Sequence, residues 1–264
     1  MTARIYTVGN LKGGTGRSTT VTNIGAELAE RGHRVLIVDT DPQGSATKCL
    51  GITPEVGYSL GELINTPPPH TAPDVSEVVY QSDDLPNVYV IPAEYQSLLS
   101  AETTMTGLRG AAVLHTKITK PLREDYDYIF FDTPPNLGVL TSATIYAADY
   151  AIPLVGPYAE TYEGAISFQA AVQVNNDVAP TETQIPFWLR VNWADSAEGR
   201  RVAAQLTDEG ATVLDAVLPN SRRASNTADE YRVPMVIAQP GYPFSQKVKA
   251  MVDAFVAAEG KQEA

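Results

Sequence analysis

A glycine-rich turn at residues 10–18 carries the strongest chemical signal in the sequence. Gly13, Gly14 and Gly16 follow an apolar run at residues 5–8 and precede a segment with helical spacing of apolar residues. Because glycine has no Cβ atom, consecutive backbone N–H groups of such a turn can converge on one anion. A helix starting there adds unpaired N–H groups and the positive end of its dipole. The stretch therefore predicts a strand, a phosphate loop and a helix, unless it is only a tight connection.

Acidic residues follow two further apolar runs of strand length. The run at residues 34–39 closes with Asp39 and is followed by Asp41, and the run at residues 126–132 closes with Asp132. Strands that are apolar throughout are typical of a parallel sheet, where ligands bind beyond the carboxyl ends. We therefore expect the three carboxylates beside the phosphate loop, with Asp132 holding magnesium through water. Two simpler interpretations stay open: Asp-Pro often begins a turn, and Asp132 could cap the next helix.

The loop and the carboxylates together resemble the ParA/MinD family of partition and positioning ATPases. The deviant loop of that family reads K-G-G-x-G-K-[ST], and residues 12–18 match it except that Arg17 replaces the second lysine. The D-x-D-P-Q-G string from Asp39 resembles the second family motif, and the likeness extends over residues 5–255. The resemblance implies a P-loop NTPase of the α/β class, with a mostly parallel twisted sheet and helices on both faces. It also implies a single ATPase domain over residues 1–264.

The resemblance further implies a role for each matching residue. In the family the early lysine, here Lys12, reaches the nucleotide of a partner subunit, and the second aspartate, here Asp41, orients the attacking water. ATP or ADP would bind with Mg²⁺. The catalytic residues would be Lys12, Arg17 and Asp41; the nucleotide would be bound by Gly13, Gly14, Thr15, Gly16, Arg17, Ser18, Thr19, Asn192, Pro219 and Asn220; magnesium would be held by Ser18, Asp39 and Asp132.

Asn192 and Asn220 are expected near the adenine site. The amide of Asn192 offers a donor and an acceptor, which suits a purine edge, but an asparagine in a turn after a strand is an equal alternative. Asn220 stands where the family usually has arginine after proline.

Arg17 is the largest departure from the family motif. Lysine is a compact point charge, whereas guanidinium is planar, larger and forked, so the exchange is not conservative. One hypothesis is that Arg17 bonds the phosphates bidentately and leaves a slow, partner-stimulated ATPase. The other hypothesis is that its head group does not fit. The chain would then be a nucleotide-dependent adaptor that hydrolyses ATP very weakly or not at all.

The net charge of −12 restricts the partners that the chain can bind. Nonspecific DNA binding needs a basic surface, which this acidic chain can supply only locally. The basic positions available for it are Arg200, Arg201, Arg222, Arg223, Lys247 and Lys249. Ordinary solvated charge is the alternative explanation for these residues. The resemblance implies an ATP-dependent homodimer, a ParB-type centromere-binding partner, DNA bound without sequence preference, and the segregation of a plasmid or chromosome.

Cysteine content and hydropathy point to the cytoplasm, and the resemblance adds association with the nucleoid. Cys49 is the single cysteine, so a disulfide framework is excluded. The N-terminus has no apolar signal region, and no apolar run reaches membrane length. A last helix expected at residues 243–258 has one apolar side, and the acidic Glu259 and Glu263 beyond it favour packing against the sheet. We therefore expect no membrane partner.

Overall fold

One mixed sheet organises the computed structural model, which describes residues 2–65, 71–179, 181–220 and 222–262. Within these residues the eight strands follow the order β3-β4-β2-β5-β1-β6-β7-β8, and all neighbours are parallel except β3 and β4. The strands are β1 Arg4–Gly9, β2 Val35–Asp39, β3 Tyr80–Gln81, β4 Val88–Ile91, β5 Tyr128–Asp132, β6 Tyr150–Val155, β7 Trp188–Trp193 and β8 Val213–Pro219. The prediction of a mostly parallel sheet is therefore confirmed.

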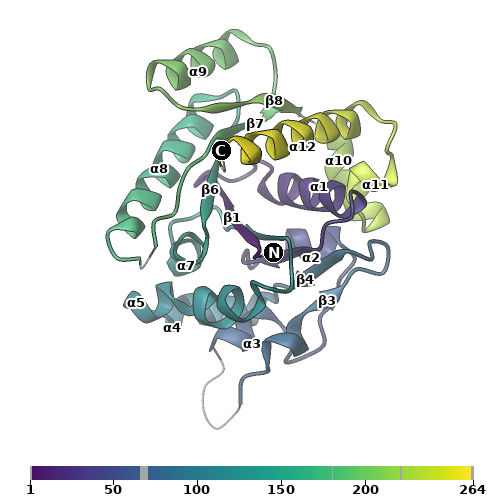
Figure 1. The fold of residues 1–264 in the computed structure, drawn as a ribbon, viewed down its shortest axis with the longest axis vertical. Coiled ribbons are helices and arrows are strands. Elements are labelled where there is room, and N and C mark those ends of the chain that lie inside the picture. Colours follow the sequence, from purple (N-terminus) through teal and green to yellow (C-terminus); the bar gives the residue numbers. More distant parts are fainter. Residues whose placement is uncertain (1, 66–70, 180, 221, 263–264) are drawn as a thin grey trace.

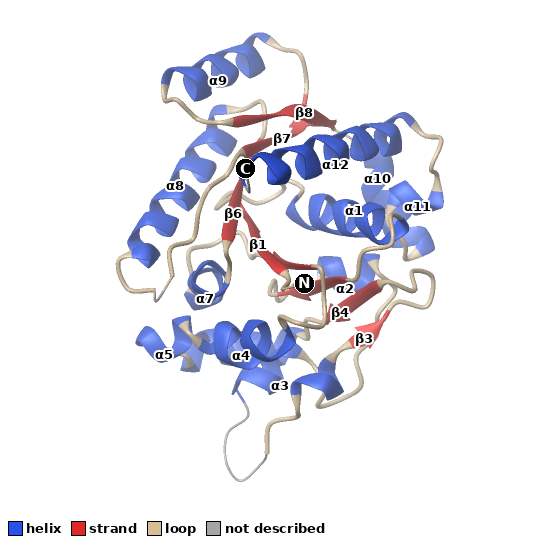
Figure 2. Cartoon of the chain, in the orientation of Figure 1, coloured by secondary structure: helices blue, strands red, loops and turns tan. Residues whose placement is uncertain are grey.

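Helices cover both faces of this sheet (Figure 1 and Figure 2). The α-helices are α1 Arg17–Glu30, α2 Ser45–Cys49, α3 Leu60–Asn65, α4 Tyr95–Thr104, α5 Gly107–Ala111, α6 Lys120–Leu122, α7 Val139–Ala147, α8 Ala159–Asn176, α9 Ala197–Asp208, α10 Arg222–Tyr231, α11 Met235–Ala238 and α12 Pro243–Gln262. A 3₁₀ turn, η1, spans Val75–Val78, and a π-helical segment, η2, spans His115–Thr119. Residues of α1, α11 and α12 share one core, whereas α3, α4 and α7 contribute to the core on the other face.

The alternation along β2 shows why its sequence is apolar throughout. Val35 and Ile37 belong to the core beneath α1 and α12, while Leu36 and Val38 belong to the core beneath α3 and α4. All four side chains are completely buried. A strand covered on both faces leaves no position for a polar residue until it ends, which is where Asp39 stands.

The last helix packs against the sheet as expected. Val248, Met251, Val252 and Phe255 are completely buried in the core. The acidic residue expected at the free end, Glu259, is itself only 3% exposed. In the described part of the chain, no helix combines the length and the apolar character needed to cross a membrane.

Three polar groups of the sheet hold Glu259 in place. It accepts hydrogen bonds from the hydroxyls of Tyr6 at 2.5 Å and Tyr128 at 2.9 Å, and pairs with Arg4 at 3.1 Å. A buried carboxylate is tolerated when it is paired and hydrogen-bonded in this way. The C-terminal helix is therefore fixed to β1 and β5, the strands that lead into the site.

The sequence predicts one helix at residues 108–123, and the structure has an irregular helical stretch there. It contains the end of α5, a turn at Ala112, the π-helical η2 and the short α6. Pro121 lies in the first turn of α6 and has no N–H for a helical bond to residue 117, which accounts for the π-helical bonding just before it. The sequence also predicts a strand at residues 185–192, and β7 lies in this region but begins at Trp188.

Candidate functional site

The carboxyl ends of three neighbouring strands bring the predicted acidic residues to one edge of the sheet. Strand β5 lies between β1 and β2, and Asp132 is the register partner of both Asp39 and Val8. The phosphate loop continues directly from β1 into α1. Parallel pairing therefore places two carboxylates beside a glycine-rich loop, although they are 93 positions apart in sequence.

The loop needs glycine at two positions because the backbone is left-handed there. Gly14 has φ of 74° and Gly16 has φ of 82°, a region that residues with a side chain adopt at a cost. Around Gly13 and Gly14 no atom lies within 4 Å of the position that a Cβ would take. Both glycines also line the pocket described below, so this part of the loop backbone is accessible.

Asn10 fixes the first half of the loop, a role that the motif comparison did not identify. This residue is completely buried, and its Nδ2 donates to the carbonyls of Leu154 and Thr161, both at 2.7 Å. Its Oδ1 accepts from the N–H of Lys12 at 2.7 Å. A Cβ on Gly164 would stand 2.2 Å from that Oδ1, so glycine is required where α8 passes the loop.

Arg17 is directed into its own loop. Its Nη1 donates to the carbonyls of Asn10 at 2.9 Å and Lys12 at 2.8 Å and to the hydroxyl of Thr15 at 3.2 Å. Its Nε donates to the carbonyl of Thr133 at 2.8 Å. The side chain is 8% exposed and joins the loop after β1 to the loop after β5. A lysine at this position lacks the forked donors that make all these bonds together.

The charge of Arg17 is also coupled to the acidic residues. Burial lowers the pKa of its guanidinium, while the nearby carboxylates of Asp132 and Asp41 raise it again. Among the described residues, no acceptor bonds to its Nη2, and Arg17 lines the pocket over the loop. Two of the three guanidinium nitrogens, Nε and Nη1, are therefore committed to acceptors of the protein.

Asp132 is the least satisfied charged group of the site. It is completely buried, and no donor in the described residues bonds either carboxylate oxygen. Its pKa lies well above the ordinary value, first because of burial and then because of the neighbouring Asp39 carboxylate. The Ser18 hydroxyl and the Arg17 guanidinium favour the charged form, although Ser18 does not reach hydrogen-bond geometry. A carboxylate in this setting requires a proton or a cation.

Asp39 has a different environment, although it too is completely buried. Its Oδ2 accepts from the N–H of Thr47 at 2.8 Å and from the Thr47 hydroxyl at 2.7 Å, and its Oδ1 accepts from the N–H of Asp41 at 3.2 Å. Burial raises the pKa of Asp39, and the bonds from Thr47 lower it in part. Asp39 therefore anchors α2 and the Asp41 loop, and its role as a magnesium ligand stays a prediction.

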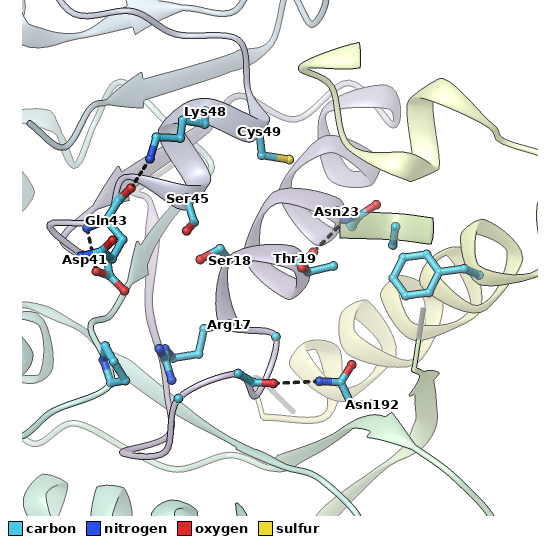
Figure 3. Close-up of a pocket in the computed structure, with 16 residues that line it drawn as sticks. Arg17, Ser18, Thr19, Asn23, Asp41, Gln43, Ser45, Lys48, Cys49 and Asn192 are labelled. Atoms are coloured by element: carbon cyan, nitrogen blue, oxygen red, sulfur yellow. Dashed lines mark hydrogen bonds between the residues drawn. The ribbon is translucent and has the colours of Figure 1, made fainter. Parts of the chain in front are cut away.

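A pocket of about 580 Å³ lies over the phosphate loop (Figure 3). It is lined by Gly13, Gly14, Gly16, Arg17, Ser18, Thr19, Asn23, Asp41, Gln43, Ser45, Lys48, Cys49, Pro135, Asn192, Ala224 and Phe244. The volume suits a nucleotide-sized ligand. Motif comparison did not identify Asn23, Lys48, Cys49 or Phe244, and the five residues of α2 are too few for a periodic pattern that would place Lys48.

Asp41 faces the pocket, whereas Lys12 lies at the surface of the protein. Asp41 is 8% exposed, lines the pocket and accepts from the N–H of Gln43 at 2.9 Å, so it faces the ligand space. The Nζ of Lys12 pairs with Glu160 at 2.7 Å, and the two side chains are 50% and 71% exposed. Lys12 is therefore directed to the surface, outside the set of described residues that line the pocket.

Of the three residues expected around adenine, one lines the pocket and two do not appear among its described lining residues. Asn192 lines the pocket, and its Nδ2 donates to the carbonyl of Gly14 at 3.2 Å. Its φ of 50° is unusual for a residue with a side chain, so the contact with the loop is held at some backbone cost. Pro219 and Asn220, at the end of β8, do not appear among the described lining residues.

The six basic residues considered for DNA binding lie on three helices. Arg200 and Arg201 are on α9, Arg222 and Arg223 on α10, and Lys247 and Lys249 on α12. Arg200 pairs with Asp195 at 2.6 Å, and the guanidinium of Arg223 lies over the ring of Tyr242 at 4.8 Å. Figure 1 shows α9 at the top of the molecule and α10 at the right, so the α9 arginines are separate from the α10 pair.

The side chains near Asp132 fit a magnesium ion. Mg²⁺ prefers oxygen ligands and keeps several waters, and proteins usually bind it through one or two carboxylates together with substrate phosphates. The unpartnered Asp132 carboxylate and the Ser18 hydroxyl provide oxygen ligands of that kind beside the loop. Asp132 does not cap α7, whose N-cap is Gly138.

The combination of a glycine-rich loop entering a helix with acidic strand ends beside it defines a P-loop NTPase fold. A family model described as an AAA domain matches residues 3–182. The sporulation initiation inhibitor protein Soj of Bacillus subtilis (strain 168) is 36% identical over 150 residues, which cover 56% of this chain and 56% of Soj. The chromosome partitioning protein ParA of Caulobacter vibrioides (strain NA1000 / CB15N) is 31% identical over 235 residues, covering 84% of this chain and 82% of the relative.

The chain therefore belongs to the ParA/MinD family. It spans only 56% of Soj and 53% of the ParA protein of Myxococcus xanthus (strain DK1622). A variant of McdA from Cyanothece in complex with ATP superposes with a TM-score of 0.82 at 23% identity, over 96% of each chain. Cobyrinic acid a,c-diamide synthase from Mycobacterium smegmatis with bound ADP and magnesium superposes with a TM-score of 0.72 at 28% identity, covering 87% of this chain and 92% of that one.

The substitution Asp132→Asn tests whether this carboxylate is held for a cation. Because it removes a desolvated charge, we expect it to raise the free energy of unfolding of the ligand-free protein by about 1 kcal/mol. We also expect it to abolish any stabilisation of the protein by ATP that depends on Mg²⁺. Urea unfolding measures the first effect, and thermal unfolding with ATP, with and without Mg²⁺, measures the second.

The exposed Asp125, which precedes β5, provides the matched control Asp125→Asn. That variant should change neither quantity. A ligand-free Asp132→Asn protein that is less stable than wild type, yet is still stabilised by ATP only when Mg²⁺ is present, would contradict the assignment.

Proposed function

We propose that the chain binds Mg-ATP and hydrolyses it slowly as a ParA-like partition ATPase. The observation that carries this proposal is the buried Asp132 carboxylate, without a bonding donor in the described residues, beside an open phosphate loop. The bound nucleotides in the complexes of the McdA variant and of the cobyrinic acid synthase support the choice of ATP and ADP as ligands.

Each group of the site has a task in this proposal. The N–H groups of residues 13–19 bind the phosphates, and the hydroxyl of Ser18, with Asp132 and Asp39, holds magnesium. The ion, when bound, neutralises charge on the β- and γ-phosphates. Asp41, which faces the pocket, orients the attacking water and receives its proton.

The position of Arg17 supports the alternative hypothesis of an adaptor that binds ATP but hydrolyses it very weakly or not at all. Its Nε and Nη1 are committed to protein oxygens, so a bidentate grip on the phosphates requires breaking bonds to the loop. The geometry favours a loop that is braced before nucleotide arrives, with only Nη2 directed to ligand. Binding without turnover would follow if Nη2 does not reach the oxygens where charge develops.

Phosphate release by wild type, Arg17→Lys and Asp41→Ala separates the two hypotheses. For a slow ATPase, wild type should release phosphate when DNA and a ParB-type partner are present, and Asp41→Ala should be about a hundredfold slower. For an adaptor, wild type should be as inactive as Asp41→Ala while Arg17→Lys turns over. If Arg17→Lys is slower than wild type, the arginine is adapted to hydrolysis and the adaptor hypothesis fails.

We also propose that the chain forms a homodimer and binds DNA and a protein partner. Two chains would associate around ATP, with the exposed Lys12 leaving Glu160 to reach the nucleotide of the partner subunit. The ATP-bound homodimer would bind DNA without sequence preference and be stimulated by a ParB-type centromere-binding protein. The protein would act in the cytoplasm, associated with the nucleoid and not with membrane, in the segregation of a plasmid or chromosome.

Two matched charge reversals test the DNA surface. We expect Arg222→Glu with Arg223→Glu to abolish ATP-dependent retention on nonspecific duplex, because these arginines are exposed on one helix. Arg200→Glu with Arg201→Glu should have a much smaller effect, since Asp195 already neutralises Arg200. Retention by wild type should fall steeply with salt. No ATP-dependent retention of wild type at low salt would remove DNA from the proposal.

A further inference from the structure

Within a single chain, the known motif leaves the terminal phosphate of a bound nucleotide without a freely placed positive group. The Arg17 guanidinium donates through Nε and Nη1 to carbonyls of its own loop and of Thr133. Lys12 is paired with Glu160 at 2.7 Å and lies outside the set of described residues that line the pocket. Neither cation is thus a mobile charge inside the ligand space of a single chain.

Lys48 is a second positively charged residue of the pocket, on a flexible side chain. Of the described residues that line the pocket, only Lys48 and Arg17 carry positive charge. Lys48 is exposed, in contrast to the buried Arg17. Its Nζ donates to the carbonyl of Gln43 at 2.6 Å, and Figure 3 shows the side chain reaching from α2 toward Gln43 and Asp41. The lysine is therefore next to the loop that is proposed to orient the attacking water.

The backbone of α2 gives Lys48 a fixed base. The side chain of Thr47 points the other way and is bonded to Asp39 at 2.7 Å, and the N–H of Thr47 bonds to the same carboxylate. Ser45 and Lys48 are three positions apart, so both lie on the pocket side of the helix. The flexible four-carbon stem of lysine lets the ammonium move from the Gln43 carbonyl to a ligand without a change in α2.

The charge balance of the site favours such a movement. Asp39, Asp41 and Asp132 contribute up to three negative charges, and the Mg-ATP complex brings further negative charge. Arg17, whose pKa burial lowers, is the one buried cation among the described residues that line the pocket. If Asp41 acts on the γ-phosphate as proposed, a cation beside Asp41 and Gln43 would act on ATP and hardly on ADP, which lacks that phosphate.

We propose that Lys48 binds the γ-phosphate, and that it gives the site its preference for ATP over ADP in place of a P-loop lysine. This inference rests on the proposed function, since it assumes that a nucleotide occupies the pocket. In the ligand-free chain the ammonium is held by the Gln43 carbonyl. On ATP binding it exchanges that carbonyl for a phosphate oxygen, which is a stronger, charge-assisted acceptor.

Calorimetric titration of Lys48→Met with a non-hydrolysable ATP analogue and with ADP, both with Mg²⁺, tests this role. We expect the affinity for the analogue to fall about tenfold or more, the loss expected for one charge-assisted hydrogen bond. The affinity for ADP should stay within about twofold of wild type. Lys48→Gln should show the same pattern, and Lys117→Met, which changes an exposed lysine on η2, should behave as wild type.

Other outcomes overturn the proposal in distinguishable ways. If Lys48 only braces the Asp41 loop through the Gln43 carbonyl, the affinities for the analogue and for ADP will fall together. Unchanged affinities for both ligands would show that the ammonium does not reach the phosphates. In either of these cases wild type still binds nucleotide and the proposed function stands. If wild type binds neither ligand, the proposed function and the role of Lys48 fail together.

Discussion

The structure depends on two carboxylates that parallel strand pairing buries side by side. Asp39 and Asp132 are register partners at the carboxyl ends of β2 and β5, and both are completely buried. Asp39 is satisfied by Thr47 and by the backbone of Asp41, whereas Asp132 has no bonding donor among the described residues. In the proposed function, a cation bound at Asp132 would compensate this buried charge, so we expect metal and phosphate binding to be coupled.

Arg17 braces the phosphate loop from within. Its guanidinium bonds to the carbonyls of Asn10, Lys12 and Thr133, so it joins two loops that approach the ligand from different strands. Asn10 holds the same loop from the side of β6 and α8. The loop is thereby preorganised. In our proposal, the terminal phosphate is bound by a more flexible side chain, that of Lys48.

The sequence was sufficient to predict the sheet and the meeting of the loop with Asp39 and Asp132, because strand ends in a parallel sheet share one edge. It was not sufficient for side-chain direction. Whether Arg17 turns toward ligand or toward its own loop depends on carbonyls from Thr133, 116 positions away. The pocket position of Lys48 depends on the short α2, which has too few residues for a periodic pattern. The helix predicted at residues 108–123 forms, but a turn at Ala112 and the π-helical η2 ahead of Pro121 interrupt its regular bonding, and these local details were not predicted.

The most direct test of this account is the Mg²⁺ dependence of ATP binding, measured by calorimetry on the wild-type chain. Because Asp132 lacks a compensating cation and the phosphate loop is open, we predict that ATP binds once per chain, and that its affinity drops steeply when Mg²⁺ is removed. ATP binding of equal strength with and without Mg²⁺, or no binding in either condition, would contradict the central claim.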